Sequence, residues 1–276
     1  MIVVRGKSSD GETPTVYSID DNLVKNLEQA IKRNKRGWDY VAIVTGLPGV
    51  GKSTFTRYMA RFVDEKFSNG NVYLDAEEMI DKASKDELYR SQVLDESFRD
   101  LGTSAVKSKG FFELVNWLQL SRQKRGFIFL ILPDFFSLSK NLAIFRSSHL
   151  FVVYEDDNGE RAFAAFDRER KKQLYILGRQ FLNYNAVEPS FRGRFPMECQ
   201  KGDIVNIDEY DKKKLQHLKN QSKNFEKVSK HQEQFDRLVY NIHTNMNIEA
   251  EKIADMAGVS RATAYNAINR YKLRYG

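Results

Sequence analysis

The sequence predicts an α/β domain with a mostly parallel sheet flanked by helices, followed by a small all-α domain. Three observations lead to this prediction. From Tyr40 to about residue 166, short apolar runs alternate with amphipathic helical patterns, which is typical of a sheet covered by helices. A glycine-rich segment at residues 46–53 joins the first of these strands to a helix. Beyond Asp203 the strand patterns stop, and segments rich in Lys and Gln replace them.

The expected elements follow from apolar periodicity and from turn residues. Two strand-like segments, 2–4 and 15–17, precede a helix that begins near Asp20 or Asp21. The later strands are expected at 40–45, 71–75, 91–95, 127–132, 150–154 and 161–166, with a hairpin turn at 156–159. Helices are expected around 55–62, 77–83, 111–122 and 142–145, then at 208–222 and 225–245, followed by a compact helical module at about 246–273. The predicted domains are therefore residues 1–205, a helical linker and first module helix at 206–245, and a C-terminal module at 246–276.

Composition excludes several classes of protein. The chain has 276 residues, of which 41% are hydrophobic, so it can bury a substantial core. Its single cysteine, Cys199, excludes an internal disulfide framework and a cysteine-rich zinc site. The longest apolar run, 127–132, is too short to span a bilayer, and the N-terminus has no signal-peptide pattern. We therefore expect a soluble cytoplasmic protein, in the host cytoplasm if the source is viral.

The basic residues are concentrated in the C-terminal part of the chain. Residues 161–276 contain 22 Lys and Arg against 14 Asp and Glu, whereas residues 1–160 contain 22 against 23. A local excess of positive charge favours a polyanionic partner such as nucleic acid. A solvated lysine-rich surface explains the same excess equally well.

The glycine-rich segment fits the phosphate-binding pattern G-x-x-x-x-G-K-[ST] at every fixed position. Glycines let several backbone N–H groups converge on one phosphate, and the helix that follows adds the positive end of its dipole. The lysine side chain reaches the β- and γ-phosphates, and the serine hydroxyl is a ligand for Mg²⁺. The pattern predicts an ATP and Mg²⁺ site made by Gly46, Gly49, Val50, Gly51, Lys52, Ser53 and Thr54.

Such a site also needs a carboxylate that holds Mg²⁺, and three expected strand ends offer one. Asp75 follows Lys52 too closely in the sequence to lie on the strand that carries the Mg²⁺ carboxylate, and it suits the neighbouring strand instead. Asp95 is favoured because Glu96 follows it directly, so that Asp95 can bind Mg²⁺ while Glu96 orients the attacking water. Asp134 is the alternative, and if Asp95 holds the metal, Asp134 becomes a candidate sensor of the γ-phosphate.

This order of motifs resembles the P-loop ATPases that have an additional strand between the P-loop strand and the Mg²⁺ strand. The group includes RecA-like and FtsK/HerA-like motors and the large terminases of phages, and the resemblance covers about residues 40–180. It is carried by the segments 93–96, 121–125, 127–136 and 144–148. The resemblance implies a homo-oligomeric ring in which an arginine of one subunit acts at its neighbour's ATP. Candidates for that arginine are Arg122, Arg125 and Arg146.

Residues 248–268 resemble a helix-turn-helix of the resolvase and homeodomain-like kind. Ala254 is small where two helices would cross, Gly258 permits a left-handed turn, and Ser260 is a suitable N-cap. The second helix would bury Ala264 and Ile268. The resemblance implies contacts to double-stranded DNA by Ser260, Arg261, Thr263, Tyr265, Asn266 and Arg270. A helical oligomerisation or lid module has a similar pattern.

Together these features favour a Mg²⁺-dependent, DNA-directed ATPase of a virus or mobile element that packages or translocates DNA. A viral portal would then be a possible partner, and no membrane span is expected. Two alternatives stay open. The same P-loop suits a nucleotide or polynucleotide kinase, although the adjacent acids 95 and 96 favour water as the nucleophile. An ATP-switched, site-specific DNA-binding regulator or initiator would also combine the two domains.

Overall fold

The computed structural model describes residues 1–7, 13–95 and 109–275. Within these residues the chain divides into two compact units, Met1–Asp211 and Lys212–Gly276. Each unit is described by itself, and the helix α7 (Ile207–Asn245) contributes residues to both.

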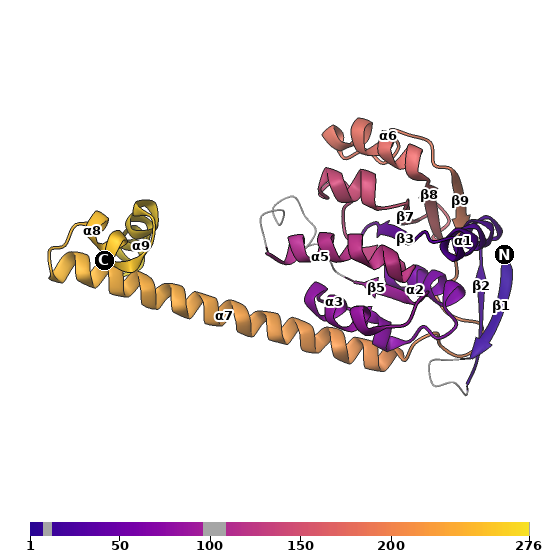
Figure 1. The fold of residues 1–276 in the computed structure, drawn as a ribbon, viewed down its shortest axis with the longest axis horizontal. Coiled ribbons are helices and arrows are strands. Elements are labelled where there is room, and N and C mark those ends of the chain that lie inside the picture. The colour runs from indigo at the N-terminus through magenta and orange to yellow at the C-terminus, as the bar shows by residue number, and fades with distance from the viewer. Residues whose placement is uncertain (8–12, 96–108, 276) are drawn as a thin grey trace. The chain divides into compact units, whose positions relative to one another are not determined.

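The first unit is built on a seven-stranded sheet in the order β4-β5-β6-β3-β7-β8-β9. Figure 1 shows this sheet with helices around it. From β4 to β7 every neighbouring pair is parallel, and the pairs β7–β8 and β8–β9 are antiparallel. The mostly parallel sheet predicted from the sequence is therefore confirmed, as is the hairpin of β7 and β8, whereas the edge strand β9 was not predicted. The strands are β3 (Tyr40–Thr45), β4 (Val72–Tyr73), β5 (Ser91–Leu94), β6 (Phe127–Ile131), β7 (His149–Glu155), β8 (Arg161–Phe166) and β9 (Phe191–Arg194).

The sheet is buried on both faces because its central strands are apolar at every position. In β3, Ala42 and Val44 face one core, and Val41 and Ile43 face the other. The side chains of strand β6 alternate between the two cores in the same way, and Phe129 lies in the first core. Alternate side chains of a strand point to opposite faces, so a continuous apolar run requires cover on both sides.

Helices from different parts of the chain provide that cover. The first core includes residues of α1 (Asp21–Lys35) and α2 (Lys52–Val63). The second includes residues of α3 (Ala76–Lys85), α5 (Lys109–Leu120), α6 (Arg168–Gly178) and the short segment Asn141–Arg146. Shorter 3₁₀ turns lie at Asn69–Asn71, Ser121–Lys124 and Arg179–Phe181. A separate antiparallel pair, β1 (Ile2–Lys7) and β2 (Pro14–Ile19), packs Tyr17 and Ile19 into the first core.

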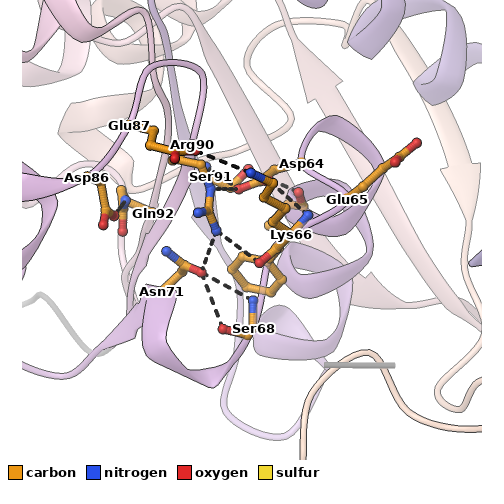
Figure 2. Close-up of polar contacts among 12 residues, drawn as sticks. Asp64, Glu65, Lys66, Ser68, Asn71, Asp86, Glu87, Arg90, Ser91 and Gln92 are labelled. Atoms are coloured by element: carbon orange, nitrogen blue, oxygen red, sulfur yellow. Dashed lines mark hydrogen bonds and ion pairs between the residues drawn. The ribbon is translucent and has the colours of Figure 1, made fainter. Parts of the chain in front are cut away.

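The short strand β5 is fixed at its amino end by a buried carboxylate (Figure 2). Asp64, just after α2, accepts hydrogen bonds from Arg90 Nε at 2.9 Å and from the Ser91 backbone N–H at 2.8 Å. The same arginine donates to the carbonyl of Lys66 at 2.9 Å and to Asn71 Oδ1 at 3.2 Å. The Asp64 side chain is only 5% exposed, so water screens its ion pair with Arg90 only weakly. The pair holds the end of α2 against the start of β5.

The second unit consists of helices. The helix α7 is continuous, whereas the sequence pattern predicted two helices at 208–222 and 225–245. No proline or glycine occurs between Ile207 and Asn245, so nothing in the local sequence ends the helix. After α7 come α8 (Ala250–Ala257) and α9 (Arg261–Tyr275), which pack small side chains against Val239. Gly258, at φ +64°, makes the left-handed turn between them.

None of the helices that the described residues form is both long and apolar enough to cross a membrane.

A histidine at the start of β7, His149, gives the stability of the first unit a pH dependence. Burial, with the nearby Lys171 ammonium, lowers the pKa of His149 to about 4, whereas an unfolded histidine titrates near 6.5. The stabilisation that the neutral imidazole contributes is complete above the pKa of the unfolded histidine. It is lost as the pH falls from that pKa toward 4. We predict that this group lowers the free energy of unfolding by about 2 kcal/mol between pH 7 and pH 5.

Urea unfolding at several pH values measures this effect. His149→Phe keeps an aromatic ring against Tyr40, whose ring centroid lies 5.3 Å from that of His149. The variant should therefore show a flatter pH profile than the wild type. An equally steep profile in the variant would assign the effect to other groups.

Candidate functional site

The glycine-rich segment lies between the carboxyl end of β3 and the start of α2, where a phosphate can approach the backbone. Three of its glycines have positive φ: Gly46 at +144°, Gly49 at +80° and Gly51 at +92°. A Cβ on Gly46 would lie 2.1 Å from the Val153 carbonyl oxygen. A Cβ on Gly51 would lie 2.9 Å from the Met197 sulfur. Gly46 is thus required for both its dihedral angles and its contact with the backbone, whereas Gly51 is required for its positive φ, since the Met197 side chain is flexible.

Lys52, the first residue of α2, folds back over the loop that precedes it. Its Nζ donates to the carbonyl oxygens of Gly46 and Leu47, each at 2.8 Å. The cation therefore lies at the mouth of the loop, where it can neutralise phosphate charge. Val50 is buried in the first core and anchors the middle of the loop.

Ser53 and Asp95 are brought together from distant parts of the sequence. Ser53 Oγ donates to Asp95 Oδ2 at 2.8 Å. Asp95 directly follows β5, and β6 lies between β5 and β3 in the sheet, so one strand separates the P-loop strand from the strand of Asp95. A hydroxyl and a carboxylate beside the loop are the oxygen donors that Mg²⁺ prefers, and these residues therefore fit the ion.

The structure adds two residues that the sequence analysis did not identify. Tyr210, in the first turn of α7, donates its hydroxyl hydrogen to Asp95 Oδ2. Arg57 lies over the Tyr210 ring, 5.0 Å from its centroid, and donates from Nε to the Ser53 carbonyl at 3.1 Å. Burial first, and then Asp95, raises the pKa of the Tyr210 hydroxyl, so it keeps its proton. No sequence motif marks Tyr210, because 115 positions separate it from Asp95.

The other two acids that the sequence offered serve local structure. Asp75 is the N-cap of α3 and accepts from the Glu78 N–H at 3.0 Å. Asp134 closes a turn after β6: its carboxylate accepts from the N–H groups of Phe136 at 3.2 Å and Ser137 at 2.8 Å. The Tyr184 hydroxyl also donates to Asp134, at 2.9 Å. Glu96, the predicted water-orienting acid, lies outside the described residues.

The three candidate arginines lie near the amino ends of the strands, whereas the P-loop lies at the carboxyl end of β3. Arg146 is paired with Asp39 and donates from Nε to the Leu118 carbonyl at 3.0 Å. Arg122 lies over the Trp38 ring, 5.8 Å from its centroid, and both line a cavity of about 890 Å³. Arg125 donates to the Tyr89 hydroxyl at 3.1 Å. Within one chain, none of the three contacts the P-loop residues described above.

In the second unit, the predicted DNA-contact residues differ in how they are held. Ser260 Oγ accepts from the Thr263 N–H at 3.2 Å, as expected of an N-cap, and its hydroxyl also bonds Thr263 Oγ1 at 2.8 Å. Arg261 is exposed, with one ion pair to Glu251 at 3.0 Å. Two further members of the predicted set, Tyr265 and Asn266, are exposed on α9.

The Arg270 side chain is 41% exposed, and it also makes a contact that the sequence did not predict. Its Nε and one terminal nitrogen donate to the two oxygens of Asp236, each at 2.8 Å. The Asp236 side chain is 2% exposed. Arg270 therefore satisfies a buried carboxylate on α7 and fixes α9 against that helix.

The comparisons with known proteins give distant structural likenesses. The sequence matches no protein-family model, and no curated protein matches it. Among solved structures, the N-terminal domain of zonular occludens toxin from Neisseria meningitidis is 19% identical, with a TM-score of 0.37, over 47% of this chain and 84% of that one.

Two further structures are of the genome packaging NTPase B204 from Sulfolobus turreted icosahedral virus 2, both 11% identical to this chain. The complex with AMP has a TM-score of 0.38 over 48% of this chain and 94% of that one. The complex with ATP-gammaS has a TM-score of 0.36 over 60% of this chain and 97% of that one.

The requirement for glycine in the loop differs between two positions and can be measured. Gly46→Ala should lower the free energy of unfolding by more than about 3 kcal/mol, because its Cβ would meet a backbone carbonyl. Gly49→Ala is the matched control, since its φ is also positive but no atom lies within 4 Å of the added Cβ. It should cost about 1–2 kcal/mol from backbone strain alone. Equal losses for the two variants in urea unfolding would contradict the assigned close approach to β7.

Proposed function

We propose that this chain is a Mg²⁺-dependent, DNA-directed ATPase that packages or translocates DNA for a virus or mobile element. The observation that carries the proposal is the hydrogen bond from Ser53 to Asp95 beside the glycine-rich loop. It joins the hydroxyl and the carboxylate that the predicted Mg²⁺ site requires. The loop glycines and Lys52 supply the complementary site for phosphates.

Each residue has a role that its position supports. The loop N–H groups and Lys52 bind and orient the phosphates, and Ser53 with Asp95 holds the metal. Bound Mg²⁺ would neutralise phosphate charge and keep the nucleotide in a reactive orientation. Glu96 follows the metal carboxylate in sequence, and we assign it the orientation of the attacking water. We assign no sensor role to Asp134, because its carboxylate closes a local turn.

The C-terminal module supports the DNA-directed part of the proposal. The helices α8 and α9, joined by a turn at Gly258, leave Arg261, Tyr265 and Asn266 exposed. These side-chain types contact phosphates and base edges in helix-turn-helix proteins. The motor assignment, the ring of identical subunits and a portal-like partner follow from the sequence resemblance.

The phosphate and metal sites can be tested by three substitutions in the full chain. Lys52→Ala should lower the ATPase kcat at least 100-fold, because it removes charge that stabilises the reacting phosphate. Asp95→Asn should raise the Mg²⁺ concentration for half-maximal activity, because it removes a charged oxygen from the metal site. Asp134→Asn is the control, expected to lower stability by about 1–2 kcal/mol through its turn hydrogen bonds while leaving the Mg²⁺ requirement unchanged.

The outcomes of this series separate the candidate reactions. Wild-type turnover in Lys52→Ala would contradict the phosphate site. A lost Mg²⁺ response in Asp134→Asn, with a normal one in Asp95→Asn, would reverse the assignment of the acids. Transfer of phosphate to an acceptor other than water would replace the ATPase by a kinase.

The proposed DNA contacts predict two different effects. Arg261→Ala should weaken DNA binding for all sequences and reduce the slope of log K against log salt by about 1, because one phosphate contact is lost. Asn266→Ala should instead reduce the preference between sequences, since an amide can pair with adenine. Gel shifts over a range of salt concentrations measure both effects.

Arg270→Ala is a poor probe of DNA contact, because it leaves Asp236 buried without its partner and should unfold the module. Shortening the chain to residues 1–222 gives the decisive comparison. If the shortened chain binds DNA as tightly as the full chain does, the helix-turn-helix assignment fails and the module is better explained as an oligomerisation or lid element.

A further inference from the structure

The proposed metal carboxylate is contacted by the first turn of α7. Tyr210 donates its hydroxyl hydrogen to Asp95 Oδ2, the same oxygen that accepts from Ser53 Oγ at 2.8 Å. Tyr210 is 6% exposed, and the guanidinium of Arg57 lies over its ring. One carboxylate oxygen therefore joins α2, β5 and α7.

Two donors on one oxygen restrict the rotation of a carboxylate. The Ser53 hydroxyl approaches from α2 and the Tyr210 hydroxyl from α7, so the Asp95 side chain is oriented by two separate elements. Hydrogen-bond partners of metal ligands commonly change metal affinity 10–100-fold.

We infer that Tyr210 is a positioning residue for Mg²⁺ binding and links the nucleotide site to α7. The inference rests on the proposed function of that site. It deepens that function by connecting the site to the helix that continues into the second unit. The link is reciprocal: metal and nucleotide that bind at Asp95 change the hydrogen bond of Tyr210, and displacement of the first turn of α7 removes a donor from Asp95.

A second anchor of the same turn provides a control. Asn69 Nδ2 donates to the Asn206 carbonyl at 3.0 Å and to Glu209 Oε2 at 2.6 Å. These bonds hold the start of α7 without contacting Asp95. Loss of the Asn69 anchor and loss of the Tyr210 hydroxyl should therefore both loosen the turn, but only the second should alter the metal site.

The test uses the full-length chain and a fluorescent mant-ATP probe, titrated with MgCl₂, so that binding is measured without hydrolysis. Tyr210→Phe keeps the buried ring and removes only the hydroxyl. It should raise the Mg²⁺ concentration for half-maximal probe binding about 10-fold. Asn69→Ala should leave that concentration within about twofold of wild type. Thermal unfolding of each apo variant reports any loss of stability separately.

Hydrogen exchange of residues 207–211 tests the link to α7. In wild type and Asn69→Ala, adding Mg²⁺ and ATP-gammaS should change the protection of these amides. In Tyr210→Phe, at saturating Mg²⁺ and nucleotide, that change should be lost. A merely structural role would alter stability in both variants and would not separate them in these two measurements.

The possible results distinguish this inference from the proposed function. If Asp95→Asn removes the Mg²⁺ response but Tyr210→Phe matches wild type or binds Mg²⁺ more tightly, the positioning role is refuted and the site stands. An Asn69→Ala shift as large as that of Tyr210→Phe also refutes it. If wild type shows no Mg²⁺-dependent probe binding, the proposed site fails, and the inference fails with it.

Discussion

The hydrogen bond between Ser53 and Asp95 depends on the placement of one four-residue strand. The strand β5 carries Asp95 at its carboxyl end, and the ion pair of Asp64 with Arg90 fixes its amino end. Because Asp64 follows α2, the helix that carries Ser53 is tied to β5 at both ends of the strand. The separation of hydroxyl and carboxylate is thus determined by the packing of α2 on the sheet.

A sheet covered on both faces makes this arrangement rigid. The strands β3 and β6 are buried along their whole length, and alternate residues enter two separate cores. A loop at the end of such a strand can keep three residues at positive φ because all three are glycines, which have no Cβ and adopt these angles without strain. Functional groups on loops are held accurately when the scaffold beneath them is closely packed.

Buried carboxylates are used in the same way in both units. Asp64 pairs with Arg90 in the first unit, and Asp236 pairs with Arg270 in the second. In each case the acid is nearly inaccessible to solvent and the arginine joins two segments. Removing either partner would leave an uncompensated charge, so these pairs specify how the elements meet.

The local sequence by itself determined the features that depend on spacing over a few residues. Apolar runs located every strand except β9, whose sequence FRGR has no apolar run, and the spacing of residues 46–53 located the glycine-rich loop. The start of α1 near Asp20 or Asp21 and the left-handed turn at Gly258 were also predicted, because helix starts and glycine dihedrals are local properties. The predicted interruption of α7 near residues 223–224 was wrong, since the pattern there contains no residue that ends a helix.

The tertiary structure decided which distant side chains meet. The sequence offered Asp75, Asp95 and Asp134 as carboxylates at strand ends. Strand order and loop geometry place only Asp95, of these three, in hydrogen-bond contact with Ser53. Asp75 caps α3, and Asp134 closes a turn and accepts from Tyr184. Tyr210 had no sequence signal, because its contact with Asp95 spans 115 positions and leaves no periodicity. Arg270 followed the exposed pattern of its helix, yet it pairs with Asp236, because a buried charge on α7 requires a partner from α9.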